Sequence, residues 1–342
     1  MVTVRDIANA CGVSTATVSK ALNGYGDISA ETAEKILKTA HEMHYMPNAA
    51  ARQLKTNISH SIGVLFFDET NSGLTHEFFS KILNSAKDEA ESLGYDITFI
   101  SKNIGGKEAT YLEHARYRRC DGVLIACIDF TSTSVKELVA SEIPTVTIDY
   151  SFNDKSSVMA DNVNGGYVLT KYLIMHGHRK IAFIHGENTS VTKKRMVGFY
   201  RALGEESITV PDSYIVSARY HDPEMAGEAT RALMNLKDRP TAIMYPDDYA
   251  YMGGLMELER MGMSVPRDVS CVGYDGISLS GIMHPRLTTY FQDTDKLGRL
   301  SVDKLVESIE RPKTCVPETI NVEGRLIEGH SVGQIRHRSV LG

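Results

Sequence analysis

The chain has 342 residues, of which 42% are hydrophobic and 23% charged, and its formal net charge is -6. This composition excludes a mainly disordered chain, and the length predicts two or three domains. No run of about 18 apolar residues occurs, and the first ten residues leave no room for a secretory signal, so we expect a cytoplasmic protein without a membrane partner. Five scattered cysteines without a CxxC pair favour reduced thiols over a disulfide framework or a metal site.

The charge is unevenly distributed along the chain. Residues 1–57 carry six Lys and Arg against five Asp and Glu, a balance of +1, so residues 58–342 carry -7. The asymmetry is small, and charge alone would not identify a nucleic-acid-binding region.

Three helices are predicted at the N-terminus, of which the first two are short. Thr3 caps a helix over 4–10, Gly12 supplies a tight turn, and Ser14 caps a second helix over 15–22. A third, longer helix follows. The second helix presents small side chains outward, as expected of a helix-turn-helix whose second helix enters the DNA major groove. A generic three-helix bundle has the same spacing, so spacing alone leaves both interpretations open.

The literal sequence separates these interpretations. The segments 3–8 and 12–23, followed by 45–54, resemble the headpiece and hinge of the LacI/GalR family of bacterial transcriptional regulators. The resemblance implies that the second helix reads base edges and that neighbouring polar side chains contact phosphates. The implied base-reading residues are Thr15, Ala16 and Lys20, and the implied phosphate contacts are Thr3, Ser14, Thr17, Ser19 and Asn23.

The hinge segment 48–56 has a helix-forming composition but is too short for a stable isolated helix. We therefore expect it to fold on DNA, against the hinge of a second copy. The resemblance implies that Leu54 wedges between base pairs from the minor groove and kinks the duplex, with Asn48 and Ala51 as further contacts. The alternative for Leu54 is an ordinary apolar residue in a linker helix.

From residue 59 onward, strands and helices alternate. Strands are predicted over 62–67, 95–100, 122–126, 145–148, 181–185, 214–218, 242–245 and 269–274. Helices are predicted over 76–92, 107–118, 132–140, 163–175, 192–203, 223–235, 249–261 and 294–309. Such βα units predict doubly wound parallel sheets, and two series of them predict two lobes, with the last helix packing back on the first half.

The family resemblance continues through this region at 161–162, 177–186, 265–275 and 285–289, and covers about the first 330 residues. It implies an α/β effector domain with the two-lobed architecture of periplasmic sugar-binding proteins, behind the helix-turn-helix domain. We expect a headpiece over 1–46, a hinge over 47–58, a first lobe over 59–160 and 292–318, and a second lobe over 161–291 and 319–338.

An effector site is predicted where the carboxyl ends of the strands meet, between the lobes. Asp149, Asp247 and Asp275 end or follow predicted strands, and the resemblance places Arg195 facing the ligand. Carboxylates accept sugar hydroxyls and arginine donates in a fixed fork, so this set suits a polyhydroxylated ligand. Aromatic rings would stack on its apolar face, and the candidates are Phe78, Phe79 and Tyr249. Phe66 and Phe67 fall within a strand and are expected in the core.

The alternative for each acidic candidate is a helix cap, which fits Asp248 best because it immediately precedes a predicted helix. Family members often carry asparagine where Asp247 stands and a second acidic residue where Gly276 stands. Both departures leave the identity of the effector open.

No catalytic motif is found. Residues 76–80 lack the second histidine of HExxH, residues 276–281 miss the GxSxG spacing, and no Walker-type phosphate loop occurs. His176 and His178 are expected to form a positively charged helix terminus. Clustered carboxylates leave a glycosidase pair as an alternative, but the headpiece favours binding. We therefore expect no enzyme, no cofactor and no metal.

The sequence thus predicts a transcriptional repressor that binds a palindromic DNA operator as a homodimer and is released by a small-molecule effector, expected to be a sugar. A purine-type corepressor and, in another class, a pure solute-binding protein are the alternatives. The tail 328–342 lacks a leucine heptad, so we expect no tetramer built by a C-terminal coiled coil.

Overall fold

The computed structural model describes the chain except for residues 1, 23, 25–26, 47–57, 68–72 and 336–342. The chain divides into two compact units, Met1–Ser59 and His60–Gly342. Residues 47–57 of the predicted hinge lie outside the described residues, as do four of the predicted DNA contacts, namely Asn23, Asn48, Ala51 and Leu54.

The first unit holds three helices, α1 (Val4–Cys11), α2 (Thr15–Leu22) and α3 (Ala30–Glu42), as predicted. Thr3 and Asp6 form a capping box at the start of α1, and Gly12 ends it in the left-handed region at a φ of 70°. The core between the helices consists of Ile7, Ala8, Cys11, Val18, Ala21, Ile36 and Ala40.

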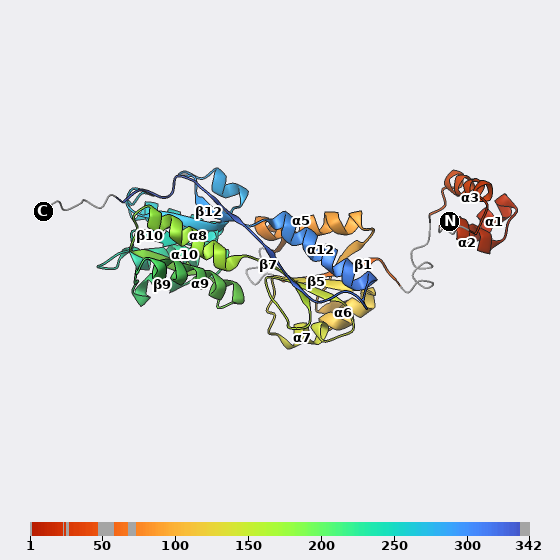
Figure 1. Ribbon diagram of the computed structural model, residues 1–342, viewed down its shortest axis with the longest axis horizontal. Coiled ribbons are helices and arrows are strands. Elements are labelled where there is room, and N and C mark those ends of the chain that lie inside the picture. The colour runs from red at the N-terminus through yellow and green to blue at the C-terminus, as the bar shows by residue number, and fades with distance from the viewer. Residues whose placement is uncertain (1, 23, 25–26, 47–57, 68–72, 336–342) are drawn as a thin grey trace. The chain divides into compact units, whose positions relative to one another are not determined.

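The first lobe of the second unit is built on a parallel sheet in the order β13-β7-β6-β5-β1-β2. The strands are β1 (Ser61–Phe66), β2 (Asp96–Phe99), β5 (Gly122–Ala126), β6 (Thr145–Ile148), β7 (Ser156–Ala160) and β13 (Thr319–Val322). One face of the sheet is covered by α5 (Glu77–Ser92) and α12 (Thr294–Glu310), the other by α6 (Tyr111–Arg118) and α7 (Thr133–Val139) (Figure 1). Burial on both faces explains the continuous apolar runs of the central strands.

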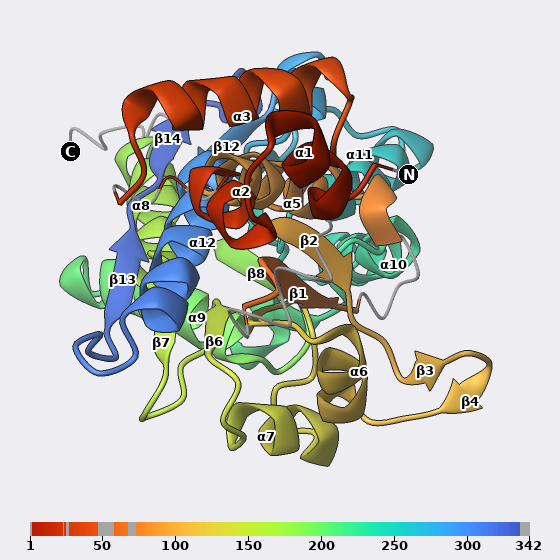
Figure 2. The same cartoon turned by 90° about the vertical axis from the view of Figure 1, so that its right-hand side faces the viewer.

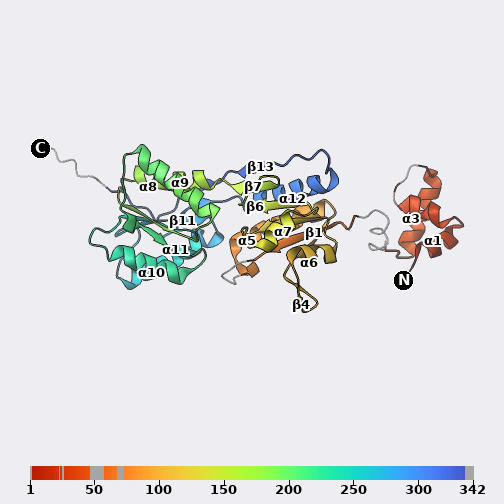
Figure 3. The ribbon, with the colours of Figure 1, turned by 90° about the horizontal axis from the view of Figure 1, so that it is seen from below.

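The second lobe repeats this scheme with the order β14-β12-β11-β10-β8-β9, in which β14 alone pairs antiparallel. The strands are β8 (Ile181–His185), β9 (Ile215–Ser217), β10 (Ala242–Met244), β11 (Ser270–Asp275), β12 (Thr288–Phe291) and β14 (Arg325–Ile327). Helices α8 (Asn162–Met175) and α9 (Ser190–Glu205) cover one face, and α10 (Pro223–Met234) and α11 (Asp248–Arg260) cover the other (Figure 3).

The described chain crosses between the lobes after β7, before α12, and between β13 and β14. Helix α12 packs on α5 in the first lobe, as predicted. The crossing expected after residue 318 is wrong, because β13 still pairs with β7 in the first sheet. The chain therefore leaves the first lobe after Val322.

One helix start was predicted four residues too early. The helix expected from Lys107 begins at Tyr111, because Thr110 and Glu113 form a capping box there. Lys107 lies instead in a hairpin of β3 (Asn103–Ile104) and β4 (Lys107–Glu108), drawn clearly in Figure 2. Two glycines with positive φ, Gly105 and Gly106, form its turn. Within the described residues, no helix is long and apolar enough to cross a membrane.

Candidate functional site

Helix α2 of the first unit exposes Thr15, Ala16 and Lys20, the three predicted base-reading residues. Its opposite face buries Val18 and Ala21 against the core. Lys20 forms an ion pair with Asp27. The exposed surface of α2 is thus made of small side chains and one lysine, which suits entry into a groove.

The predicted phosphate contacts of this unit are largely held by local hydrogen bonds. The Thr3 hydroxyl donates to Asp6 at 2.7 Å, and the Thr17 amide donates to Ser14 Oγ at 3.1 Å. Thr17 and Ser19 are half-buried, so Ser19 points outward less than expected. These bonds fix the positions of the helix starts.

In the second unit, Arg195 of α9 is 4% exposed and makes several contacts. Its Nε donates to Asn162 Oδ1 at 2.9 Å and its Nη1 to the Pro246 carbonyl at 2.6 Å. The guanidinium lies over the ring of Tyr274, 3.5 Å from its centroid, and its Nη2 is 4.0 Å from Asp275 Oδ1. A guanidinium this deeply buried requires partners, and the predicted Asp275 is one of them.

Asp275 ends β11 at a φ of 101° and is 4% exposed. Gln292 Nε2 donates to its Oδ1 at 2.7 Å. Burial raises the pKa of Asp275 to about 6, although Arg195 opposes the shift. Asp149, after β6, accepts from the Ala160 amide at 2.8 Å and from Asn162 Nδ2 at 3.4 Å. Asn162 therefore links two predicted residues from opposite lobes, Asp149 and Arg195.

The prediction that Asp248 is the helix cap is wrong, because α11 begins one residue earlier than expected. Asp247 is the cap, and it accepts from the Ala250 and His221 amides, both at 2.8 Å. Although burial acts in the other direction, His221 beside it holds the pKa of Asp247 below its usual value. Asp248 is fully buried and accepts from the Thr289 hydroxyl at 2.6 Å.

The aromatic candidates divide into two groups. Phe79 and Tyr249 both lie against His76, and their ring centroids are 5.5 and 5.0 Å from that of His76. The ring centroid of His221, from the second lobe, is 3.6 Å from that of His76. Phe78 is instead buried in the core of the first lobe, which accounts for it better than ligand contact.

The expectation that Phe66 and Phe67 are both core residues is wrong for Phe67. Because β1 ends at Phe66, Phe67 is 53% exposed. Phe66 is half-buried, and its ring lies 5.3 Å from that of Phe79.

Several residues of this cluster were not predicted as site residues. They are His76, Asn162, Tyr220, His221, Tyr274 and Gln292. Asn162 stands in a segment that carries the family resemblance, and Tyr274 directly precedes Asp275. Tyr274 could have been found by extending the strand-end argument by one residue, whereas Asn162 follows β7, a strand that was not predicted.

The predicted charged helix terminus at His176 and His178 is wrong for His178. Its Nδ1 lies 2.9 Å from Thr241 Oγ1 and its Nε2 lies 3.2 Å from the Gly333 carbonyl. Burial lowers the pKa of His178 to about 4, which makes it neutral near pH 7. His178 is therefore a buried polar residue that ties the C-terminal segment to the second lobe.

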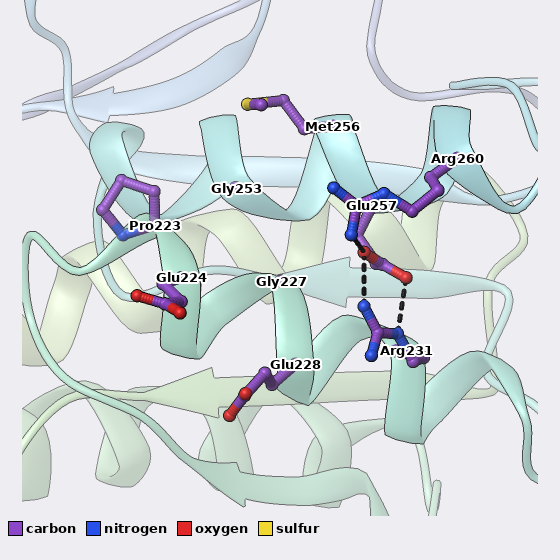
Figure 4. Close-up of a pocket in the computed structure, with 9 residues that line it drawn as sticks. All are labelled: Pro223, Glu224, Gly227, Glu228, Arg231, Gly253, Met256, Glu257 and Arg260. Carbon is purple, nitrogen blue, oxygen red and sulfur yellow. Dashed lines mark hydrogen bonds and ion pairs between the residues drawn. The ribbon is translucent and has the colours of Figure 1, made fainter.

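Two hollows of the second unit are lined by other residues. One, of about 360 Å³, lies between α10 and α11, where Arg231 and Arg260 pair with Glu257 at 2.6 and 3.2 Å (Figure 4). The other, of about 460 Å³, lies between α5 and α12 in the first lobe. In the described part of the chain, no group of three or more His, Cys, Asp or Glu side chains could hold a metal ion.

Comparison with known proteins gives matches to both units. A family model described as bacterial regulatory proteins, lacI family, matches residues 3–48, and a periplasmic binding protein-like domain matches residues 170–332. The chain is 34% identical over 318 residues to the HTH-type transcriptional repressor PurR of Vibrio vulnificus (strain CMCP6), which covers 91% of this chain and 92% of the relative.

Two solved structures share the architecture. The Lac repressor dimer bound to operator and the anti-inducer ONPF is 26% identical with a TM-score of 0.80, covering 97% of this chain and 99% of that one. A LacI family regulator from Enterococcus faecium with bound ribose is 25% identical with a TM-score of 0.69, covering 81% of this chain and 100% of that one. These likenesses confirm the predicted fold class.

Proposed function

The chain belongs to the LacI family of bacterial regulatory proteins, and on this premise we propose that its operator affinity is set by a small molecule bound at the cluster around Arg195 and Asp275. The family is one of DNA-binding transcriptional repressors with an effector domain, and it is not enzymatic. A pure solute-binding protein is excluded by the match of the headpiece to that family.

The DNA-binding part of the proposal is a homodimer that places one α2 helix in each half-site of a palindromic operator. Thr15, Ala16 and Lys20 read base edges, because these side chains are exposed and small enough to enter the major groove. The relative in the solved Lac repressor complex is a dimer bound to operator, which supports the same assembly for this chain.

The effector part of the proposal rests on one observation. Arg195 and Asp275 of the second lobe meet Asp149 of the first lobe through Asn162, so one molecule bound there would contact both lobes. Carboxylates and a guanidinium suit a polyhydroxylated ligand, and Phe79 and Tyr249 supply rings for its apolar face. A sugar is therefore the first candidate, and the ribose complex of a relative is in keeping with it.

A population shift would connect the two parts. A ligand that binds one lobe arrangement more tightly than another moves the equilibrium by that difference in affinity. The arrangement in turn sets whether the two hinge segments of a dimer can fold together on DNA.

The second candidate is a purine-type corepressor that strengthens operator binding. The observation in its favour is that a repressor named PurR is 34% identical over nearly the full chain. The candidates differ in sign, because an inducing sugar weakens operator binding and a corepressor strengthens it.

The experiment has two steps. DNA bound by the full-length protein is selected from a random pool, and operator affinity is then measured by fluorescence anisotropy with ribose, cellobiose, guanine or hypoxanthine. We expect a palindromic consensus and a change of about tenfold with one ligand, which is a typical coupling. Failure to select any DNA would contradict the repressor function. A selected operator with no response to any ligand tested, together with no thermal shift, would count against the effector site.

A further inference from the structure

The two lobes also touch outside the cluster around Arg195. The loop after β11 lies against the first turn of α5, where the Ser278 amide donates to Glu77 Oε1 at 2.7 Å. Lys81 Nζ lies 2.6 Å from the same oxygen and donates to Ser278 Oγ at 3.3 Å. Since Glu77 binds a backbone amide, the contact fixes the path of the loop itself.

The same loop is seated in the first lobe by apolar contacts. Ile277 is 3% exposed and packs in the core cluster of the first lobe. Leu279 and Tyr249, also from the second lobe, pack against that cluster. The loop therefore belongs to the second lobe but is partly buried in the first. The bond from Ser278 to Glu77 lies beside these apolar contacts.

Consecutive amides of this loop are held by carboxylates from different lobes. The Ile277 amide donates to Asp248 Oδ2 at 2.9 Å in its own lobe, and the next amide, of Ser278, donates to Glu77 across the lobes. Both segments adjoin candidate effector residues, since Asp275 lies three positions before Ser278 and His76 directly precedes Glu77. A shift of Asp275 against a ligand would move this pair of amides relative to Glu77.

From this arrangement we infer that Glu77 is a positioning residue of the effector site, which couples the place of Asp275 to the arrangement of the lobes. The inference rests on the proposed function for its consequence in DNA binding, but not for the contact itself. Because the bond from Ser278 to Glu77 joins the two lobes, its loss changes the relative free energies of the lobe arrangements even without a ligand.

A purely local role for Glu77 is the competing explanation, because Glu77 and Lys81 also form an ordinary i,i+4 pair on one helix. Helix α5 supplies a control in its last turns, where Lys87 and Glu91 form an i,i+4 pair of the opposite order at 2.8 Å. If the role of Glu77 were confined to its own helix, neither Glu77→Ala nor Glu91→Ala would change the loop after β11.

The first test is hydrogen exchange of the full-length protein followed by mass spectrometry, without DNA or ligand. In Glu77→Ala, exchange in the loop 276–280 should accelerate by about tenfold, as expected on loss of an amide acceptor. Glu77→Gln keeps an acceptor and should restore most of the protection, and Glu91→Ala should leave the loop unchanged. Equal exchange in wild type and Glu77→Ala, or equal acceleration in Glu91→Ala, would overturn the inference.

The second test measures affinity for the selected operator without ligand. Glu77→Ala should change it by about threefold or more, within the usual range for a coupled site, while Glu91→Ala matches wild type. Identical affinities of all three proteins would reduce Glu77 to a structural contact. If wild type selected no DNA, the proposed function would fail, and the exchange test would still decide whether Glu77 positions the loop.

Discussion

The two units present their candidate functional residues in opposite ways. In the first unit, Thr15, Ala16 and Lys20 stand on one short helix and are exposed. In the second, Arg195 and Asp275 are at most 4% exposed, and their partners come from segments far apart in the chain. The candidate DNA-binding surface is formed by one helix alone, whereas the cluster around Arg195 forms only when both sheets of the second unit are folded.

This difference has an energetic consequence. Side chains that stay hydrated in the free protein contribute little to its stability, so changes at the exposed residues of α2 should act on binding alone. Buried charges depend on one another, because an ion left without its partner in the interior costs several kcal/mol. Changes around Arg195 should therefore act on folding and on ligand response together. The net charges, +1 for residues 1–57 and -7 for residues 58–342, separate the two units less clearly than the exposure of their candidate residues does.

The largest expected effect breaks the buried cluster. Arg195→Ala should lower the free energy of unfolding of the second unit by about 3 kcal/mol or more, because Asp275 and Asn162 lose a buried partner. Chemical denaturation followed by circular dichroism measures this loss. Arg267→Ala, whose side chain is 73% exposed, is the control and should change stability by less than about 1 kcal/mol.

Arg195→Lys separates response from stability in the same cluster. It keeps the charge but loses the fork, so it should abolish the effector response at a smaller cost in stability. A normal ligand response in this variant would remove Arg195 from the effector site.

The next effect tests the exposed surface. Ala16→Glu places a carboxylate where α2 would meet DNA, and it should weaken operator binding by about 100-fold through steric conflict and repulsion from phosphates. Stability should be unchanged, because Ala16 is exposed. Ala30→Glu, also exposed and at the start of α3, is the matched control. A large loss of stability in Ala16→Glu would contradict the contrast between the units.

The sequence predicted these two regions to different depths, for a physical reason. The helices of the first unit follow from local signals, such as the Thr3 cap and Gly12, and their predicted bounds agree with the structure. In the second unit, the rule that ligands bind at the carboxyl ends of strands selected Asp149 and Asp275, which do lie in one cluster with Arg195. Local pattern and topology were sufficient for these residues.

The remaining features depend on contacts distant in sequence. Gln292 belongs to the cluster because β12 lies beside β11. The four residues of β12, Thr-Thr-Tyr-Phe, all favour strands, but no strand was predicted in this short run, so the position of Gln292 was missed. The strand β13 likewise has mixed burial and is defined by its pairing with β7, which is why the crossing was misplaced. Asp247 rather than Asp248 caps α11 because the predicted helix start was one residue late, an error of the size by which helix boundaries commonly differ.

The fourth prediction concerns pH and tests whether buried polar groups contribute to stability. The pKa of His178 falls from 6.5 to about 4 on burial, so between these values the unfolded chain binds a proton that the folded chain does not. The contribution of His178 is present above pH 6.5 and is lost as the pH falls towards 4, by about 3 kcal/mol. His178→Asn should flatten this part of the stability profile. Urea titrations at pH 7, 5.5 and 4.5 measure the slopes.

The smallest expected effect concerns the exposed surface of the first unit. It tests whether the side chains there act independently of one another. Lys20 is paired with Asp27 in the free protein, and both side chains are at least half exposed. To reach DNA, Lys20 must give up this pair, whose strength is that of a surface salt bridge, about 0.2–1 kcal/mol. Asp27→Asn should therefore raise DNA affinity by about two- to fivefold, and the gain should vanish in the background of Lys20→Gln. A gain on operator alone would mark Lys20 as a base contact, and an equal gain on random DNA would mark it as a phosphate contact. A gain that persists in the Lys20→Gln background would show that the charge of Asp27 itself repels DNA. The ion pair of Lys20 and Asp27 would then not be what limits the DNA affinity of α2.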